Sequence, residues 1–464
     1  MAMDNKSQRF QKVPVAELDP EVRKNNFQEV CLGYTKAEAI KEAQRCLQCK
    51  VARCRKGCPV AIDIPKFIHG LANENFKEAI ESLWEDTSLP AICGRVCPQE
   101  KQCEKNCVLT NRGDSVSIGK LERFAADYAR EQGWRLEGKK PANGHKVAIV
   151  GGGPGGLTCA GELVKEGFEV HVFEALQRLG GVLIYGIPSF RLPDDVVEAE
   201  VENLKALGVH FETNVIIGRT VTIDQLKEEG FEAFFVSSGA GLPKFLNIPG
   251  ENLNGVFSAN EFLTRANLMR ANDQNYDTPI KLGKKVSVIG GGNVAMDAAR
   301  VAKRLGSDVT IVYRRDQDSL PARAEEVHHA IEEGIHFAYL TNPKEILGND
   351  QGWVEAMKCI KMELGQADAS GRRRPSPIEG SEFILETDSV IMALGTSPNP
   401  LIAMTTEGLE TEDWGGIVVE EMGQTSREEV FAGGDAVTGA ATVILAMSSG
   451  KIGAQGIKNY LLKE

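Results

Sequence analysis

One pattern of strand, glycine-rich turn, helix and second strand occurs twice in this chain of 464 residues. The first copy spans residues 146–174 and the second spans residues 285–315. Two strands joined by such a helix form the unit of parallel α/β architecture. The glycine-rich turn lets backbone N–H groups at the start of the helix meet a pyrophosphate. The repeat therefore predicts two dinucleotide-binding domains.

The second copy has the pattern of a nicotinamide site. Gly290, Gly292 and Ala295 occupy the fingerprint positions, and an ending in alanine is a variant expected of such a site. Arg314, followed by Arg315, stands at the strand end where an acidic residue would bind a ribose. Because arginine can bind a 2′-phosphate that a carboxylate would repel, we predict NADP(H) rather than NAD(H), against the alternative of two solvated loop arginines. The residues predicted for this site are Gly290, Gly292, Asn293, Ala295, Arg314 and Arg315.

The first copy carries an acidic residue at the equivalent position. Gly151, Gly153 and Gly156 open its helix, and Glu174 ends the next strand, where a carboxylate can bind ribose hydroxyls. FAD is the natural complement to a nicotinamide site, and a late strand ending in Gly-Asp offers a carboxylate to its ribityl chain. The residues predicted for the FAD site are Gly151, Gly153, Pro154, Gly156, Glu174, Gly434, Asp435 and Thr442.

The wide separation of the two FAD segments predicts a split domain. We expect an α/β fold with an N-terminal α-helical iron–sulfur domain and two Rossmann-like domains of the glutathione-reductase type, the NADPH domain being inserted in the FAD domain. The expected ranges are 1–135 for the helical domain, 145–275 for the first half of the FAD domain, 276–390 for the NADPH domain and 391–464 for the second half of the FAD domain.

Eight of the eleven cysteines fall between residues 46 and 107, in two runs. A [4Fe–4S] cluster needs about four thiolates, and bacterial ferredoxins send a cysteine that precedes proline to the other cluster. We therefore predict two clusters in a crossed arrangement: Cys46, Cys49, Cys54 and Cys107 on one, with Cys58, Cys97 and Cys103 on the other. The second set is one ligand short, and Cys93 is a candidate by proximity. Two zinc sites are the alternative, although only the first run contains the CxxC pair that zinc sites repeat.

Electrons are expected to leave the flavin through these clusters. Disulfide reductases of this fold keep a redox-active cysteine pair beside the flavin, and neither half of the expected FAD domain contains one. Thiol–disulfide chemistry is therefore not predicted. No side chain is predicted as a general acid or base, because hydride transfer between cofactors depends on positioning. His328 and His329 lie in a charged helical segment and are expected at the surface.

Composition bounds the location and the partners. The net charge of −12 argues against nucleic acid or an anionic membrane as a partner. No uninterrupted apolar run reaches the roughly 18 residues that a membrane span needs, and the N-terminal residues lack the apolar core of a signal peptide. We therefore expect a cytoplasmic protein, in which clustered cysteines more often bind metal than form disulfides.

Over nearly its whole length the chain resembles the glutamate synthase small-subunit family. That family includes the N-terminal part of dihydropyrimidine dehydrogenase and the large subunit of NADH-dependent reduced ferredoxin:NADP oxidoreductase. The resemblance implies two [4Fe–4S] clusters, one FAD and one NADPH site in a single polypeptide. The motifs that carry it are CLQCKVARCRKGCPV, CGRVCPQEKQCEKNC, SIGKLERFAAD, GGGPGGL, YGIPSFRLP, GGGNVAMD and FAGGDAV.

The resemblance also implies roles for residues that the spacing leaves open. Glu122 in the SIGKLE segment would complete the second cluster, which would make Cys93 a non-ligand. Gly181, Tyr185 and Arg191 match the family segment that lies along the isoalloxazine ring, although a loop packed on the sheet edge is an alternative for them.

Within the family, the segments LPARAEEVHHAIEEGIHF and SGRRRPSPIEGSEF are most similar to the large, or beta, subunit of the ferredoxin:NADP oxidoreductase and to the short archaeal-type glutamate synthase. We expect the first of these to be the functional relative. This similarity implies electron transfer between NADP(H), FAD and the clusters, and on to ferredoxin and a small flavin/[2Fe–2S] partner subunit, by flavin-based bifurcation. One alternative is a glutamate synthase small subunit that feeds electrons to a glutamate-forming partner. Another is an electron-wiring subunit of a larger redox complex.

Overall fold

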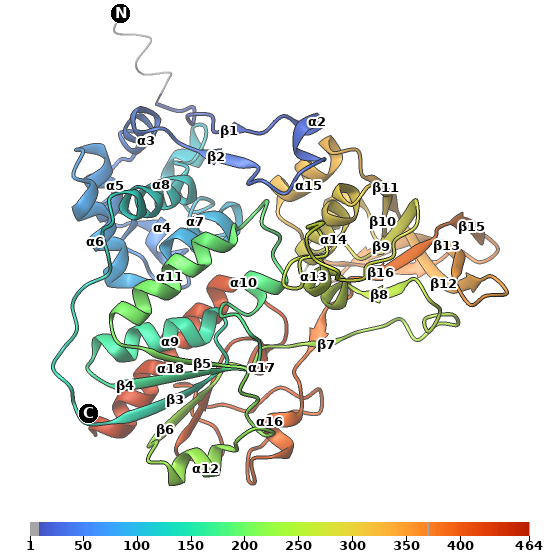
Figure 1. Cartoon of the computed structure of the whole chain (residues 1–464). Coiled ribbons are helices and arrows are strands. Elements are labelled where there is room, and N and C mark those ends of the chain that lie inside the picture. The colour runs from blue at the N-terminus through green and yellow to red at the C-terminus, as the bar shows by residue number, and fades with distance from the viewer. Residues whose placement is uncertain (1–8, 369–370, 464) are drawn as a thin grey trace, which may run out of the picture.

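The N-terminal unit of the computed structural model is a bundle of helices (Figure 1), and the described residues are 9–368 and 371–463. The first eight residues, which belong to the segment considered above for a signal peptide, lie outside this range. Helix α5 begins at Ile64, because the side chain of Asp63 caps its N-terminus by accepting a hydrogen bond from the Lys66 N–H. The apolar faces of the bundle pack together in one core. Its elements are β1 (Ala16–Glu17), α2 (Pro20–Arg23), β2 (Cys31–Gly33), α3 (Lys36–Ala43), α4 (Arg53–Lys56), α5 (Ile64–Ala72), α6 (Phe76–Asp86), α7 (Pro90–Val96), η1 (Gln99–Lys101), η2 (Val108–Asn111) and α8 (Ile118–Glu131).

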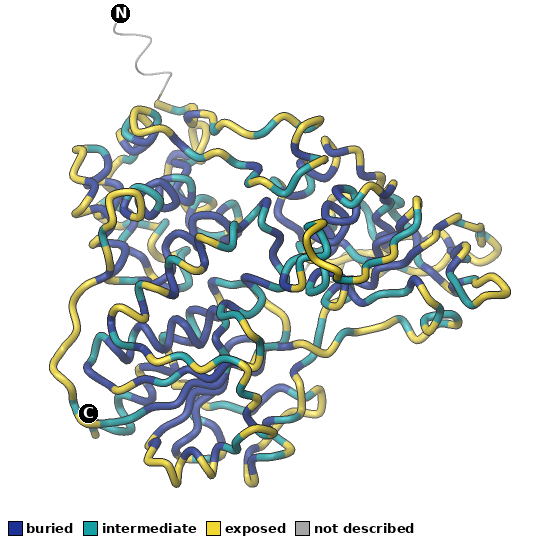
Figure 2. Tube along the Cα trace, in the orientation of Figure 1, coloured by how far each residue is buried: buried dark blue, intermediate teal, exposed yellow. Residues whose placement is uncertain are grey.

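The second unit is built on a parallel five-stranded sheet in the order β18-β6-β3-β4-β5. Its edge strand β18 comes from the C-terminal part of the chain and pairs in parallel with β6, as the split domain requires. Helices α9 and α18 pack against each other beside this sheet, whose strands β3, β6 and β18 are buried almost throughout (Figure 2). Its elements are β3 (Lys146–Val150), α9 (Pro154–Lys165), β4 (Glu169–Glu174), α10 (Val182–Tyr185), α11 (Asp194–Ala206), β5 (His210–Thr213), α12 (Ile223–Glu228), β6 (Ala233–Val236), α16 (Leu401–Met404), β18 (Val430–Ala432), α17 (Asp435–Thr438) and α18 (Val443–Leu462).

The third unit is a second parallel sheet in the order β11-β10-β9-β16-β8. The chain enters and leaves it through two short antiparallel strands that pair with each other, β7 (Leu242–Pro243) and β17 (Thr396–Ser397). Its elements are β8 (Val256–Ser258), α13 (Ala259–Ala266), β9 (Lys285–Ile289), α14 (Asn293–Arg304), β10 (Asp308–Tyr313), η3 (Gln317–Ser319), α15 (Ala324–Glu332), β11 (His336–Tyr339) and β16 (Ser389–Met392).

The inserted unit is longer than the expected range 276–390. Strand β8 pairs in parallel with β16, so residues from 256 onward belong to the inserted sheet and not to the first half of the FAD domain. Strand β16 itself runs to Met392, beyond the expected end. A three-residue edge strand such as β8 carries too little apolar pattern to be assigned to one sheet or the other from the sequence.

An antiparallel sheet extends from the inserted unit at the right of Figure 1. It contains β12 (Thr341–Gly348), β13 (Val354–Ala367), β14 (Arg373–Pro377) and β15 (Phe383–Glu386). Cys359 lies buried in its core. Across all three units, none of the helices that the structure describes is both long enough and apolar enough to cross a membrane.

Candidate cofactor sites

Four cysteines of the helical unit converge on one hollow beside α4 and α5. The hollow is lined by Cys46, Cys49, Cys54 and Cys107, with apolar side chains that include Ile68 behind them. Burial raises the pKa of Cys54 to about 11, and the neighbouring Cys46 and Cys107 thiols add to the rise. A metal cluster binds thiolates by displacing such protons. The structure thus brings together the four cysteines predicted for the first cluster.

The remaining predicted ligands form a second, more buried group. Burial raises the pKa of Cys58 to about 11, and the nearby Glu122 carboxylate and Cys97 thiol add to it. Burial likewise raises the pKa of Cys103 well above its usual value, with contributions from Glu122, Cys97 and Cys58. Three soft sulfur ligands and one carboxylate therefore lie within electrostatic reach of one another.

Glu122 has the surroundings of a metal ligand. Its side chain on α8 is 5% exposed, and its Oε1 atom has no hydrogen-bond partner among the described residues. A buried polar atom without a partner is uncommon and calls for a missing ligand. Cys93 is also buried nearby, and its Sγ donates to the Met447 sulfur of α18 at 3.5 Å. A hydrogen bond with the Cys97 thiol raises the pKa of Cys93, so this thiol also lies beside the inner group. Cys58, Cys97, Cys103 and Glu122 thus fit the donor set of an iron–sulfur cluster, and the role of Glu122 rather than Cys93 as the fourth ligand stays a prediction.

Two glycines let the segments that carry these ligands approach closely. A Cβ on Gly94 of α7 would overlap the backbone of Arg123 on α8. A Cβ on Gly57, which precedes Cys58, would overlap the Asn106 side chain of the second cysteine run. Glycine is required at such contacts because any side chain would push the two segments apart.

The predicted FAD turn lies between β3 and α9. Gly151 has φ +104°, in the left-handed region, and a Cβ on Gly156 would overlap the carbonyl oxygen of Gly151. Glu174 at the end of β4 accepts hydrogen bonds from the N–H groups of Gly152 and Leu176, both at 2.8 Å. Burial raises the pKa of Glu174, while these two N–H groups oppose the rise. The acidic residue is thus held against the glycine-rich turn, where the sequence places a ribose.

Two segments that are distant in the chain from the glycine-rich turn form the rest of the predicted FAD site. Gly181, with φ +54°, lies against Gly153, and Asp435 begins α17. Burial raises the pKa of Tyr185 to about 12, and the nearby carboxylates of Asp435 and Glu174 add to the rise. The buried hydroxyl of Thr442 has no hydrogen-bond partner among the described residues. A cradle of glycine backbone with an unpartnered hydroxyl fits a bound dinucleotide.

The predicted nicotinamide turn has the same construction. Gly290 has φ +142°, a Cβ on it would overlap the carbonyl oxygen of Ala393, and Gly292 precedes α14. Arg314 follows β10 and is exposed, whereas Arg315 is half-buried and its Nε donates to the carbonyl oxygen of Arg373 at 3.2 Å. Arg314 and Arg315 both follow β10, the strand that pairs with β9. Their contact with a 2′-phosphate stays a prediction.

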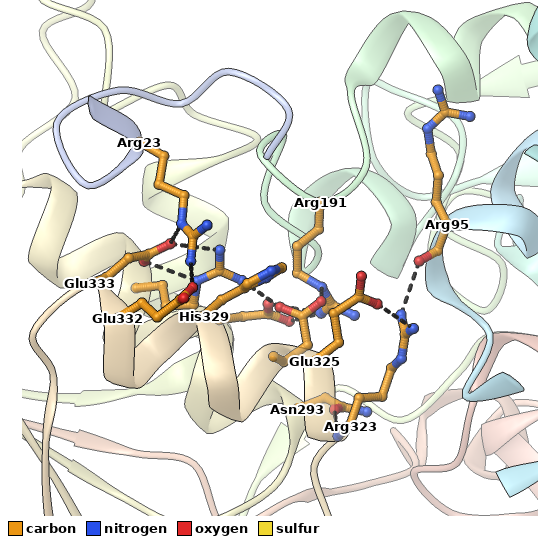
Figure 3. Close-up of polar contacts among 12 residues, drawn as sticks. Arg23, Arg95, Arg191, Asn293, Arg323, Glu325, His329, Glu332 and Glu333 are labelled. Atoms are coloured by element: carbon orange, nitrogen blue, oxygen red, sulfur yellow. Dashed lines mark hydrogen bonds and ion pairs between the residues drawn. The ribbon is translucent and has the colours of Figure 1, made fainter. Parts of the chain in front are cut away.

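Arg191 has partners that the sequence did not reveal. Its Nη1 lies 2.8 Å and 2.7 Å from the two carboxylate oxygens of Asp297 on α14. Its Nε lies 2.8 Å from Glu326 on α15. Figure 3 shows the surrounding cluster of arginine and glutamate side chains. The ion pairs join the FAD unit to the inserted unit, and the predicted contact of Arg191 with a flavin ring stays a prediction.

The same cluster corrects the position expected for His329. This side chain is buried, 4% exposed, and its Nε2 lies 3.0 Å from a Glu17 carboxylate oxygen of the N-terminal unit. His328 is exposed, as expected. The charged residues of α15 suggest a solvent-exposed helix, but its acidic face packs against arginines of other units. Arg23 of the N-terminal unit, for example, pairs with Glu332 at 2.5 Å.

Arg323 links the nicotinamide turn to the cysteine-rich unit. Its backbone N–H donates to the side-chain oxygen of Asn293 at 2.9 Å. Its guanidinium donates to the carbonyl oxygen of Arg95 at 3.0 Å and to Gln99 Oε1 at 3.1 Å (Figure 3 shows the first of these). Gln99 stands two residues after Cys97, so the link reaches the loop that carries a predicted cluster ligand.

Comparison with known proteins agrees with this division of the chain. Residues 23–134 match the family described as dihydropyrimidine dehydrogenase domain II, 4Fe-4S cluster, and residues 145–450 match the pyridine nucleotide-disulphide oxidoreductase family. The putative oxidoreductase AegA of Escherichia coli K12 is 38% identical over 95% of this chain and 68% of its own length. The structure of Mycobacterium tuberculosis FprA in complex with NADPH has a similar fold, with a TM-score of 0.59 at 20% identity over 70% of this chain and 85% of that one.

Two further relatives are named as parts of larger enzymes. The glutamate synthase [NADPH] small chain of Halomonas elongata is 38% identical, covering 97% of this chain and 98% of the relative. The NADPH-Fe(3+) oxidoreductase subunit beta of Geobacter sulfurreducens is 34% identical, covering 94% and 68%.

The fold, the two glycine-rich turns and the cysteine-rich unit define an NADP-dependent oxidoreductase that uses FAD, NADP(H) and [4Fe–4S] iron–sulfur chemistry. Within that class, the chain belongs to the glutamate synthase small-subunit-like family. The predicted fold class, family and kinds of cofactor are confirmed.

Proposed function

We propose that this oxidoreductase passes electrons from NADPH through FAD and two [4Fe–4S] clusters to ferredoxin and a partner subunit, by flavin-based bifurcation. When bound, the nicotinamide supplies a hydride, the flavin exchanges two electrons or one, and the clusters carry single electrons. In this proposal Cys46, Cys49, Cys54 and Cys107 hold the outer cluster. Cys58, Cys97, Cys103 and Glu122 hold the inner cluster.

The observation that carries the proposal is that helix α18 contacts both the loop of the inner ligands and the FAD site. Ser448 donates to the carbonyl oxygen of Pro59, the residue after Cys58, at 3.0 Å. The next residue, Ser449, accepts a hydrogen bond from the Gly434 N–H at 2.6 Å. Adjacent residues of one helix thus contact the loop of the inner ligands and the Gly-Asp turn of the FAD site. Such proximity supports direct electron transfer between the flavin and the inner cluster.

The inner ligand group is more buried than the outer one, as electron transfer from the flavin to an external acceptor requires. Cys97 and Cys103 of the inner group are buried, whereas the four cysteines of the outer group are half-buried and line a surface hollow. The inner group lies beside the flavin unit, and the outer group faces solvent. An external one-electron acceptor would therefore meet the outer cluster.

The other residues of this chain would position and separate the cofactors. Glu174 and Asp435 would bind the ribose and ribityl hydroxyls of FAD, and Arg314 would bind the 2′-phosphate of NADP(H). The ion pairs of Arg191 with Asp297 and Glu326 hold the unit of the nicotinamide site against the FAD unit. Such positioning is what hydride transfer between two bound cofactors needs.

A second function is favoured by one comparison. The small chain of Halomonas elongata glutamate synthase matches this chain over almost the full length of both. The chain would then feed electrons from NADPH to a partner that forms glutamate, in place of ferredoxin and a small flavin/[2Fe–2S] subunit.

An anaerobic purification of the native complex separates the two functions. We expect a small flavin/[2Fe–2S] subunit to co-purify, and NADPH to reduce ferredoxin only when NAD⁺ is also present. Glutamate formation from glutamine and 2-oxoglutarate, with a large amidotransferase in the complex, would support the second function and contradict the first.

A further inference from the structure

The outer ligand group opens onto a surface patch that is apolar at its centre. Leu47, Val51 and Val108 are 43%, 68% and 36% exposed. Leu47 and Val108 line the same hollow as the four thiols, and Val51 follows two residues after Cys49. Grouped apolar side chains that stay exposed mark interaction sites more often than scattered ones do.

The charged residues of the first cysteine run are basic. Lys50, Arg53 and Lys56 are exposed within the first cysteine run, where residues 46–58 contain four basic residues and no acidic one. The fourth, Arg55, pairs with Asp63 at 2.9 Å. The local charge is therefore opposite in sign to the net charge of −12 of the whole chain.

The second cysteine run contains two acidic residues, Glu100 and Glu104, and both are half-buried. Glu100 lies 3.6 Å from the Nε atom of Arg323. The Oε1 atom of Glu104 accepts a hydrogen bond from the Gly119 N–H at 3.2 Å. The exposed charged residues of the first cysteine run, beside the outer thiols, are therefore basic.

We propose that Leu47, Val51 and Val108, together with the basic residues Lys50, Arg53 and Lys56 of the same cysteine-rich segment, form the docking patch for an acidic one-electron carrier protein of the ferredoxin class. The choice of carrier rests on the proposed function, whereas the position of the patch rests on its charge and its apolar centre. Complementary charge speeds encounter and orients the partner, and the apolar centre lets it approach the outer cluster closely. A small patch of this kind suits a transient electron-transfer complex.

The test compares two charge-reversal variants of the full chain with its cofactors. Lys50→Glu/Lys56→Glu changes the patch, and Lys77→Glu/Lys139→Glu makes the same change in charge on α6 and the linker, away from the predicted ligands. The probe is an acidic [2Fe–2S] ferredoxin, with its Kd measured at low salt and its reduction by NADPH followed. NADPH-driven reduction of a small dye and the iron content are measured in parallel.

We expect the patch variant to weaken ferredoxin binding about tenfold or more and to raise its KM similarly, because rim charges act mainly on association. Dye reduction and iron content should stay at the wild-type level, and the control variant should bind ferredoxin normally. If the double glutamate variant misfolds, Lys50→Gln/Lys56→Gln should show a smaller loss of binding in the same direction.

Three results would overturn the docking patch: equal ferredoxin binding by the patch variant and the wild type, equal loss in the control variant, or binding of anionic vesicles with no binding of ferredoxin. A wild-type protein that binds ferredoxin through the patch but transfers no electrons from NADPH would contradict the proposed function alone. The binding and reduction measurements therefore separate the two failures.

Discussion

The guanidinium of Arg323 donates a hydrogen bond to Gln99 Oε1 at 3.1 Å, across the boundary between the inserted unit and the helical unit. Gln99 in turn donates through its side-chain nitrogen to the carbonyl oxygen of Cys93 at 3.2 Å. Because the backbone of Arg323 is bound to Asn293 in the nicotinamide turn, these contacts form a continuous polar connection from that turn to Cys93, beside the inner ligand group.

We expect Arg323→Ala to lower the free energy of unfolding by about 2–3 kcal/mol, because buried acceptors on Arg95 and Gln99 lose a charged donor. Denaturant unfolding of the loaded protein measures this loss. Arg323→Lys is the matched control and should recover part of it, since lysine keeps the charge but not the fork geometry. Wild-type stability in the alanine variant would show that these contacts contribute nothing.

Replacing Glu122 should remove one cluster and leave the other. In Glu122→Ala the inner group keeps three sulfur ligands, so its cluster should be lost or become labile, and the iron content and low-temperature EPR spectrum should show a single remaining cluster. Cys93→Ala is the control and should keep both, because Cys93 already contacts Met447. Full iron content in Glu122→Ala would exclude the carboxylate as a ligand.

The choice between NADPH and NADH should depend on Arg314. We expect Arg314→Ala to raise the KM for NADPH about 10- to 100-fold and to leave that for NADH unchanged, because a charged hydrogen bond to phosphate contributes on the order of 1.5–3 kcal/mol. Steady-state dye reduction with each nucleotide measures the ratio. Arg135→Ala, which changes an exposed arginine in the linker before the FAD unit, is the control. An unchanged preference for NADPH would assign the 2′-phosphate to another residue.

Folding stability should fall as pH rises from about 4.5 to about 8 through the titration of Glu200. This side chain is 4% exposed, its Oε1 accepts from the Ala91 N–H at 2.8 Å, and burial raises its pKa from 4.5 to about 8. The unfolded chain ionises at the lower pH, so it releases its proton first, and the native state loses relative stability, by up to a few kcal/mol.

Comparison of the wild type with Glu200→Gln isolates this effect. The glutamine variant should show a flatter dependence of the denaturation midpoint on pH across that range, because it cannot ionise. Parallel curves for the two proteins would mean that Glu200 keeps an ordinary pKa in the folded state.

Local patterns were enough to predict the class of protein. The glycine spacing of the two turns and the clustering of the cysteines each depend on residues close together in the chain, so their meaning survives without knowledge of the fold. The family resemblance supplied Glu122, which the pattern of α8 alone presents as an ordinary helix carboxylate. The structure adds its burial and its unpartnered oxygen.

The sequence by itself determined the two dinucleotide turns, the split domain and the cysteine groups, because glycine and cysteine are required there by backbone sterics and ligand chemistry. Only the tertiary structure decided that Arg191 pairs with Asp297, that His329 is buried, and that β8 belongs to the inserted sheet. Those outcomes depend on contacts between segments far apart in the chain. They are set by buried ion pairs and by strand pairing at the places where the units meet, and no local periodicity encodes these contacts.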